Sequence, residues 1–304
     1  MSRLWSPICD QLGIETPIFG FAHDVATVAA ISRAGGYGVY GATRRFPQEI
    51  RDELAEIRSL VGDKPFGVDL VLPPGMPEHN SREAIEAEIP QEHKDFVQSI
   101  IDRFDVPAAT KPGMRTRFIR SSEIEAEQIE AVLDSSVNMF ACGIGAPRPV
   151  VEAAKAKGQT TLALIGSPHH VQRSIDAGVE IIVAQGYDAG AHTGTIGTFS
   201  LVPQIVEAAG DIPVLVAGGV ATGQHIAAAL AMGAQGVWLG TAWLFSEEHQ
   251  NHMHPVNTKK LIEAGSGDTV ITRSESGKTF RQIRTGWSQA WEAENAPAPL
   301  KMPY

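Results

Sequence analysis

The chain has 304 residues, 43% of them hydrophobic, and a formal net charge of −10 at pH 7. That length accommodates one large α/β barrel or two ordinary domains. The acidic balance argues against a nucleic-acid binder, which needs a basic face to displace phosphate counterions. Cys9 and Cys142 are the only cysteines, so the sequence predicts neither a disulfide framework nor a cysteine-rich zinc site.

Two further features concern the cellular location. The apolar stretches stay under about ten residues, too short to span a bilayer. The first residues lack the charged and apolar regions of a signal peptide. We therefore expect a cytoplasmic protein without membrane contact.

Eight short apolar runs alternate with helical patterns along the chain. Their apolar residues are nearly continuous, which is typical of strands buried on both faces of a parallel sheet. The expected strands are Pro17–Ala22, Tyr37–Gly41, Pro65–Leu70, Ser136–Cys142, Thr160–Ile165, Val179–Gln185, Pro213–Ala217 and Gln235–Gly240.

The helical stretches between these runs end at or near a glycine, which relieves the left-handed position after a helix. They are Asp24–Ala34, Pro47–Val61, Ser122–Leu133, Pro147–Lys157, Pro168–Ala177, Leu201–Ala209 and Thr222–Met232. Eight strands with helices between them predict a (β/α)₈ TIM barrel, with a doubly wound sheet as the alternative.

Two segments fall outside the repeating pattern, within what we expect to be a single domain over residues 1–304. Residues 71–120 separate the third strand from its helix and contain a charged helical portion near Ser81–Phe104. A loop of this length is usually functional or disordered, and after a barrel strand it would cover the active-site face, so we expect a lid. Residues 242–304 are expected to form an irregular tail with one helix near Thr258–Glu263.

A glycine pair after the seventh strand indicates a phosphate site. Ala217-Gly218-Gly219-Val220 follows that strand, and Gly240-Thr241 follows the eighth. In barrels these two loops often bind phosphate, because glycine leaves backbone N–H groups accessible and the next helix, capped by Thr222, adds partial positive charge. The alternative is glycine used only for tight turns.

A second motif, QGYDAGAHTG over residues 185–194, follows the sixth strand. Its small residues allow a planar ring to approach the backbone. Its one histidine, His192, is the side-chain type best suited to move a proton near neutral pH. We therefore expect a catalytic role for His192, against the alternative of a structural histidine.

These two motifs resemble the nitronate monooxygenase family. The resemblance rests on VAQGYDAGAHTG and IPVLVAGGVATGQHIAAALAMGAQGVWLGTAWL, and on the opening TPIFGFAHDVATVAAISRAGGYGVYGA. It implies FMN as cofactor and His192 as the catalytic base. By position, the residues it places near the cofactor are Ala22, Asp69, Gln185, Gly186, Gly190, Ala191, Ala217, Gly218, Gly219, Gly240 and Thr241.

The sequence departs from the family pattern at two places. Phe21-Ala22-His23-Asp24 stands where the family usually has a Pro-Met-Ala-Gly type turn, and Asp69 stands where it commonly has asparagine. An ionised aspartate offers no hydrogen-bond donor, so these departures bear on the substrate. His23 and Cys142 are candidate substrate contacts, and burial as a small hydrophobe is the alternative for Cys142.

Two charged clusters are expected to have no function. His249, His252 and His254 form the run HQNHMH, but no nearby aspartate or cysteine completes a metal site, so we expect a solvated loop and no metal. A basic patch at the end of the lid is expected to be a solvated face, with attraction of anionic substrate as the alternative. It consists of Lys111, Arg115, Arg117 and Arg120.

The sequence thus favours an FMN-dependent oxygenase that oxidises a nitronate, a nitroalkane or a similarly acidic small substrate with O₂. An NAD(P)H-dependent FMN reductase of quinone or enoyl type is the alternative, and a non-catalytic flavin-binding protein is a third. The expected partners are the small-molecule substrate and O₂, with NAD(P)H and a second copy in a homodimer as further candidates.

Overall fold

Eight parallel strands close into a barrel in the computed structural model, which describes residues 4–78, 81–110, 113, 117–250 and 252–301. The strands are β1 (Ile18–Ala22), β2 (Tyr37–Gly41), β3 (Phe66–Val71), β4 (Met139–Gly143), β5 (Thr160–Ile165), β6 (Ile181–Gln185), β8 (Val214–Ala217) and β9 (Gly236–Leu239). Each pairs with its neighbour, and β9 pairs with β1 to close the ring. The TIM barrel is confirmed, and the doubly wound alternative is wrong because that sheet would stay open.

Helices follow the strands on the outside of the barrel. They are α2 (Val25–Arg33), α3 (Pro47–Val61), α6 (Ser122–Leu133), α7 (Arg148–Ala156), α8 (Val171–Asp176), α9 (Thr198–Ala209) and α10 (Gly223–Ala231). The expected bounds agree to within about three residues at each end. The stretch expected over Pro168–Ala177 begins with a 3₁₀ turn, Pro168–His170, before α8.

Alternation along each strand sorts its side chains between two layers. In β3, Phe66, Val68 and Leu70 belong to the outer layer that packs on the helices. In β4, Met139 and Ala141 belong to the inner layer, together with Tyr37 and Val39 of β2. The inner layer fills the barrel, and helix α1 (Pro7–Leu12) covers its amino-terminal end with Ile8 and Cys9.

A second, antiparallel sheet lies at the other end of the barrel. It joins β7 (Ala191–His192) to β11 (Phe280–Ile283) and β11 to β10 (Thr269–Thr272). In its register His192 faces Phe280. The tail expected to be irregular therefore contains two strands of this sheet as well as α11 (Glu247–Gln250), α12 (Pro255–Glu263) and α13 (Gly286–Trp291). This part of the tail forms strands because β11 pairs with β7, in the loop after β6, far away in the sequence.

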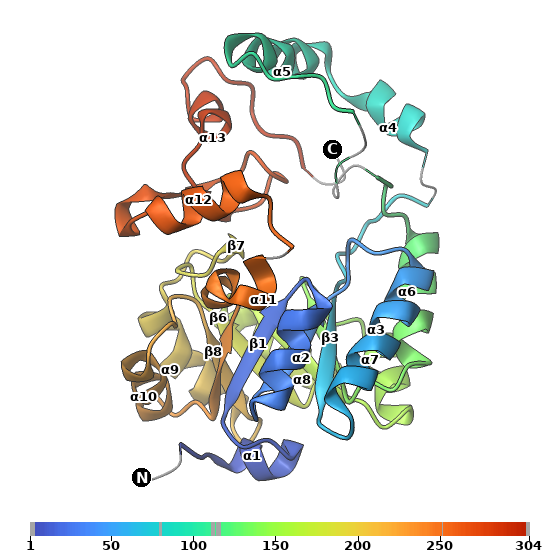
Figure 1. Cartoon of the computed structure of the whole chain (residues 1–304), viewed down its shortest axis with the longest axis vertical. Coiled ribbons are helices and arrows are strands. Elements are labelled where there is room, and N and C mark those ends of the chain that lie inside the picture. The colour runs from blue at the N-terminus through green and yellow to red at the C-terminus, as the bar shows by residue number, and fades with distance from the viewer. Residues whose placement is uncertain (1–3, 79–80, 111–112, 114–116, 251, 302–304) are drawn as a thin grey trace.

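The segment expected to be a lid contains two helices, α4 (Arg82–Glu88) and α5 (Gln91–Arg103). Figure 1 shows α4, α5, α12 and α13 gathered on one side of the barrel, with α1 at the opposite end. We call segments 81–104 and 255–300 together the cap. The end of the barrel that faces the cap, where the strands' carboxyl ends meet, is the mouth.

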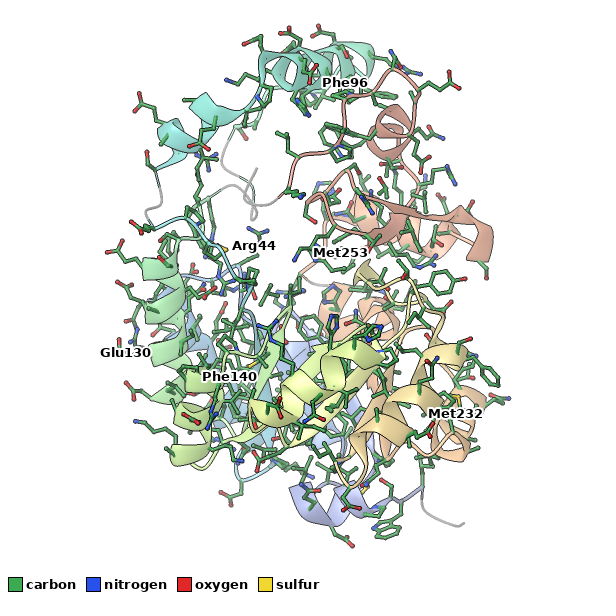
Figure 2. The ribbon with its side chains drawn as sticks, turned by 180° about the vertical axis from the view of Figure 1, so that it is seen from behind. Arg44, Phe96, Glu130, Phe140, Met232 and Met253 are labelled. Atoms are coloured by element: carbon green, nitrogen blue, oxygen red, sulfur yellow. The ribbon has the colours of Figure 1, made fainter. Side chains whose placement is uncertain are left out.

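Aromatic contacts join the two segments of the cap. The Phe96 ring of α5 packs edge-on against Trp291 of α13, with ring centroids 4.8 Å apart. Nε2 of His93 lies 2.9 Å from the carbonyl oxygen of Ala298. In Figure 2, Phe96 lies in the outer part of the cap and Arg44 at the barrel end below it. The lid segment is thus fastened to the chain's last residues. Among the described residues, no helix is long and apolar enough to cross a membrane.

Candidate active site

The inner wall at the mouth carries glycines beside titratable side chains. A methyl group at Gly41 would lie 2.5 Å from Nδ1 of His23, and one at Gly143 would lie 3.4 Å from Oδ2 of Asp69. These glycines of β2 and β4 therefore leave the room that the His23 and Asp69 side chains use. Sequence analysis missed both glycines, because their role depends on neighbouring strands.

His192 is held by contacts from outside the barrel. Its Nε2 lies 2.7 Å from Oγ of buried Ser276, in the loop between β10 and β11. Its ring packs edge-on against Phe280, with centroids 5.1 Å apart. Gln185, at the end of β6, donates a hydrogen bond from Nε2 to the His192 carbonyl oxygen at 2.9 Å. Together these contacts fix both the backbone and the ring of His192.

The backbone before His192 adopts a rare conformation. Ala191 has a φ of 65°, in the left-handed region that non-glycine residues seldom enter. Such outliers persist where surrounding contacts enforce them, and they concentrate at functional sites. The pairing of Ala191 with Arg281 in β11 provides this enforcement.

Loops after β6, β8 and β9 meet closely at the mouth. A methyl group at Gly190 would lie 2.9 Å from Oγ1 of Thr241, and one at Gly218 would lie 2.9 Å from the Ala189 nitrogen. Gly186 donates its N–H to the carbonyl oxygen of buried Ala217 at 3.0 Å. The structure thus brings together the two glycine motifs that the sequence places about 30 residues apart.

Two of these loops leave open space next to backbone amides. Gly218 and Gly219 have φ values of 102° and 74°, which L side chains rarely adopt. A methyl group at Gly240 would come no closer than 3.9 Å to a neighbouring atom, on Phe21, and one at Gly223 would meet nothing within 4 Å. This space beside glycine backbone fits a phosphate group.

Two backbone N–H groups at the start of α10, where phosphate was expected, already donate hydrogen bonds within the protein. His225 closes a capping box at the start of α10: its Nδ1 accepts hydrogen bonds from the nitrogens of Ala221 at 3.1 Å and Thr222 at 3.3 Å. An anion at this end of the barrel would therefore meet the amides of the glycine turns in preference to those of the helix cap.

Asp69 lies on the inner wall of β3, with 5% of its surface exposed. Burial raises the pKa of its carboxyl to about 7, against the opposing effect of the Arg120 charge. Its Oδ2 atom has no hydrogen-bond partner among the described residues. An acid in this position is partly neutral near physiological pH.

Cys142 and Ala22 lie on the other side of the wall. Both belong to the buried layer between strands and helices. Burial, followed by the negative charge of Asp69, raises the pKa of the Cys142 thiol to about 12. This position favours the structural alternative for Cys142 over a substrate contact, and any approach of Ala22 to a ligand would be through its backbone.

His23 follows β1 at the mouth, with Nδ1 3.0 Å from the carbonyl oxygen of Gly41. The side chain of His23 is exposed to solvent at one side. Desolvation by the surrounding protein atoms nevertheless disfavours the charged ring and lowers the pKa of His23. An exposed ring crowded by protein atoms lies in a concave surface, as a substrate contact would.

The prediction of a solvated histidine loop is wrong for His249. Helix α11 places its Nδ1 2.7 Å from Oδ2 of Asp24, a buried residue 225 positions earlier that also caps α2. His252 Nε2 lies 4.0 Å from the same carboxylate. The described residues contain no group of three or more His, Cys, Asp or Glu side chains that could hold a metal ion.

The basic patch is also not the solvated face that we expected. Arg120 is buried, donates from Nε to Oε1 of Gln128 at 2.9 Å, and has Nη2 3.2 Å from Oε2 of Glu125. Arg117 forms an ion pair with Glu49. The remaining two members, Lys111 and Arg115, lie outside the described residues. Glu49, the partner of Arg117, is 68 positions away in sequence and gives no local sign that it is a partner.

Comparison with known proteins agrees with this architecture. The family model described as "Nitronate monooxygenase" matches residues 3–304. "Putative monooxygenase Rv1533" of Mycobacterium tuberculosis is 40% identical over 97% of this chain and 80% of its own length. "Probable nitronate monooxygenase" of Bacillus subtilis is 28% identical over 95% of this chain and 81% of its own length.

Two solved structures are similar over most of the chain. Nitroalkane oxidase from Streptomyces ansochromogenes has a TM-score of 0.78 at 25% identity, covering 97% of this chain and 83% of that one. FabK from Thermotoga maritima has a TM-score of 0.74 at 27% identity, covering 96% and 79%.

A closed parallel barrel with glycine-rich loops and a positioned histidine at its mouth is typical of a (β/α)₈ enzyme, and the family match makes it an oxidoreductase. The chain belongs to the nitronate monooxygenase family, whose members are flavin-dependent. Ser276, which holds the histidine ring, was missed by sequence analysis, because a serine in a tail loop carries no local signal of its function.

Proposed function

We propose that this protein binds FMN at the mouth and oxidises a nitronate, or the neutral nitroalkane that gives rise to it, with O₂. The observation that carries the proposal is the position of His192, fixed by Ser276 and Phe280 beside the glycine turns. The family membership supports the same reaction class.

The glycine turns would hold the cofactor phosphate. Gly219 and Gly240 have no side chain to keep an anion from their backbone, and the space beside Gly240 is open. When bound, FMN would supply the redox chemistry that links oxidation of the substrate to reduction of O₂.

His192 would move the proton. A neutral nitroalkane must lose its α-proton before oxidation, and a neutral imidazole can accept it near neutral pH. The Ser276 hydroxyl can donate to one tautomer of the ring and accept from the other. It also accepts from the imidazolium that forms, which stabilises the charged product of proton transfer.

His23 and Asp69 would bound the substrate space on the side of β1 to β3. His23 presents its ring in the concave surface, and Asp69 supplies a carboxyl on the wall of β3. Both are polar groups directed at a small polar substrate in an otherwise apolar barrel.

Anaerobic mixing tests the proposal. The purified protein is mixed with an alkyl nitronate, NADH or NADPH while the flavin absorption band is followed. Reduction of the flavin by the nitronate supports the oxygenase. Fast bleaching by NAD(P)H without response to nitronate would instead support the reductase alternative, and absence of flavin from the purified protein would contradict both.

A further inference from the structure

Asp69 is the buried acid of the mouth that the proposed proton transfer does not use. The inner face of β3 carries it beside Gly143 and Val71, and Oδ2 lacks a hydrogen-bond partner among the described residues. A buried polar atom without a partner costs free energy, so such an atom at the wall of a site is one that a ligand can satisfy.

The positive charge that acts on Asp69, that of Arg120, has other partners. Arg120 approaches from the segment before α6, but its Nη2 pairs with Glu125 at 3.2 Å, Nε bonds to Gln128 and Nη1 donates to the carbonyl oxygen of Val71. Burial, followed by the like charge of Arg44 after β2, lowers the pKa of Arg120. No described side chain donates a hydrogen bond to Oδ2 of Asp69.

The neighbouring β4 strand offers no charge of opposite sign either. Its Cys142 is on the outer face and stays a neutral thiol, with a pKa raised to about 12 by burial and by Asp69. On β2 the residue in register with Asp69 is Gly41. An ionised Asp69 would therefore be a buried carboxylate whose Oδ2 accepts no hydrogen bond from the residues that the structure describes, which is costly.

We propose that Asp69 works as a neutral acid whose Oδ2–H donates a hydrogen bond to an oxygen of the bound anionic ligand, so that anion binding is accompanied by retention of a proton on Asp69. This rests on the proposed function for the class of ligand, a small planar oxyanion such as a nitronate. A buried carboxyl held neutral in an apolar site is a known way to obtain a hydrogen-bond donor.

A neutral Asp69 does not repel an anionic substrate, as an ionised aspartate would. The neutral form donates a hydrogen bond, as an amide in the same place would, whereas the ionised form repels the ligand. Because burial raises the pKa of Asp69 to about 7, the affinity of the protein for the anionic ligand should be independent of pH below neutral pH. It should fall as pH rises above that value, by about tenfold per pH unit in the limit of exclusive binding to the neutral form.

A spectroscopic test needs no turnover. The infrared spectrum of the protein should contain the carbonyl stretch of a protonated carboxyl at about pH 6, where exposed carboxyls with a pKa near 4 are ionised. Asp69→Asn should lose this band. A spectrum of the wild type at about pH 6 from which Asp69→Asn removes nothing would overturn the proposal.

A binding test uses inorganic nitrate, a planar oxyanion, as competitive inhibitor against an alkyl nitronate. In wild type the inhibition constant should rise above about pH 7, whereas Asp69→Asn should lack this rise and bind nitrate more tightly than wild type at about pH 8.5. Asp69→Leu, without a donor, should bind weakly at every pH. Coinciding profiles for wild type and Asp69→Asn would contradict the proposal.

The two tests also separate this inference from the proposed function. If the protein lacks nitronate oxidation but retains the Asp69 infrared band, the proposed function fails and the neutral acid stands. If nitronate is oxidised and the band is absent, the proposed function stands and the inference fails. Direct titration of nitrate against the flavin absorption band replaces the competition assay in the first case.

Discussion

The side chains of His192 and Ser276 meet across the mouth, with Nε2 and Oγ 2.7 Å apart although the residues are 84 positions apart in sequence. His192 comes from the loop after β6, and Ser276 from the loop between β10 and β11. The proposed base of the barrel is thus oriented by a residue outside it.

Ser276→Ala should weaken proton abstraction without removing the base. The loss of one hydrogen bond is worth about 0.5–1.5 kcal/mol, which corresponds to a fall of about two- to tenfold in kcat/KM on a neutral nitroalkane. The rate on the pre-formed nitronate should change less, since it needs no deprotonation. Ser274→Ala on the same loop is the matched control. A larger effect of the control would show that the loop as a whole matters, and not this contact.

His192→Asn should retain the flavin but lose turnover of the neutral nitroalkane. General-base catalysis contributes about 10²–10⁴-fold, and asparagine cannot accept a proton near pH 7. Steady-state kcat/KM is measured on the nitroalkane and on its nitronate, with flavin content from absorbance. Equal losses on both forms would mean that His192 orients the substrate and is not its base.

Gly219→Asp should abolish FMN binding, because the new carboxylate would occupy the phosphate position and repel it. Gly158→Asp is the control: that glycine has a positive φ, as Gly219 does, but a methyl group there would meet nothing within 4 Å, and it follows α7 at the other end of the barrel. Flavin content after purification and the dissociation constant of added FMN give the answer. If the Gly219 variant purifies with its full content of flavin, the glycine turns are not the phosphate site.

Asp69 should make stability depend on pH. Its folded-state pKa, raised to about 7, exceeds the value of about 3.9 in an unfolded chain, so between these values the folded state binds the extra proton. The free energy of unfolding should therefore fall as pH rises from about 4 to about 7, by at most about 1.4 kcal/mol for each unit of pKa difference. Urea unfolding at several pH values should show that this fall is absent in Asp69→Asn. If the free energy of unfolding depends on pH in the same way in wild type and in the variant, Asp69 is not its cause.

Phe96→Ala should loosen the lid segment. The variant loses the edge contact to Trp291, and such ring pairs contribute about 0.5–1.5 kcal/mol beyond their buried area. We expect faster amide hydrogen exchange in α5 and a changed KM, with flavin content preserved. Phe199→Ala, where the ring is 79% exposed, should leave both unchanged. Unaltered exchange in α5 would show that other contacts hold the lid.

The barrel could be predicted because its signals are local. Each strand is a short apolar run and each helix ends near a glycine, so a window of about fifteen residues contains the information. The glycine turns and the loop with His192 stand out for the same reason, since their residues are consecutive, and their roles in binding phosphate and moving a proton stay predictions. The order of the eight strands followed from the alternation of strands with helices.

The remaining features depend on residues that meet from far apart. Strands β10 and β11 are only four residues long each, and the pairing of β11 with His192 is not visible in the composition of either strand. The Asp24–His249 contact spans 225 positions, so the histidine run looked unpartnered. Sequence reading without an alignment cannot supply such pairings, because many equally plausible partners exist.

The contact between the C-terminal segment and the Ser276 loop has a consequence for synthesis. At Gly277 an added methyl group would collide with the carbonyl oxygen of Leu300, so the loop is covered by nearly the last residues that the structure describes. The strand that closes the barrel, β9, ends at Leu239. During synthesis the barrel strands therefore leave the ribosome before Leu300 does. The barrel and the proposed phosphate site can form before the loop that carries Ser276 is covered. In this order of events the nascent protein forms the proposed cofactor site first and the proposed proton-transfer geometry last.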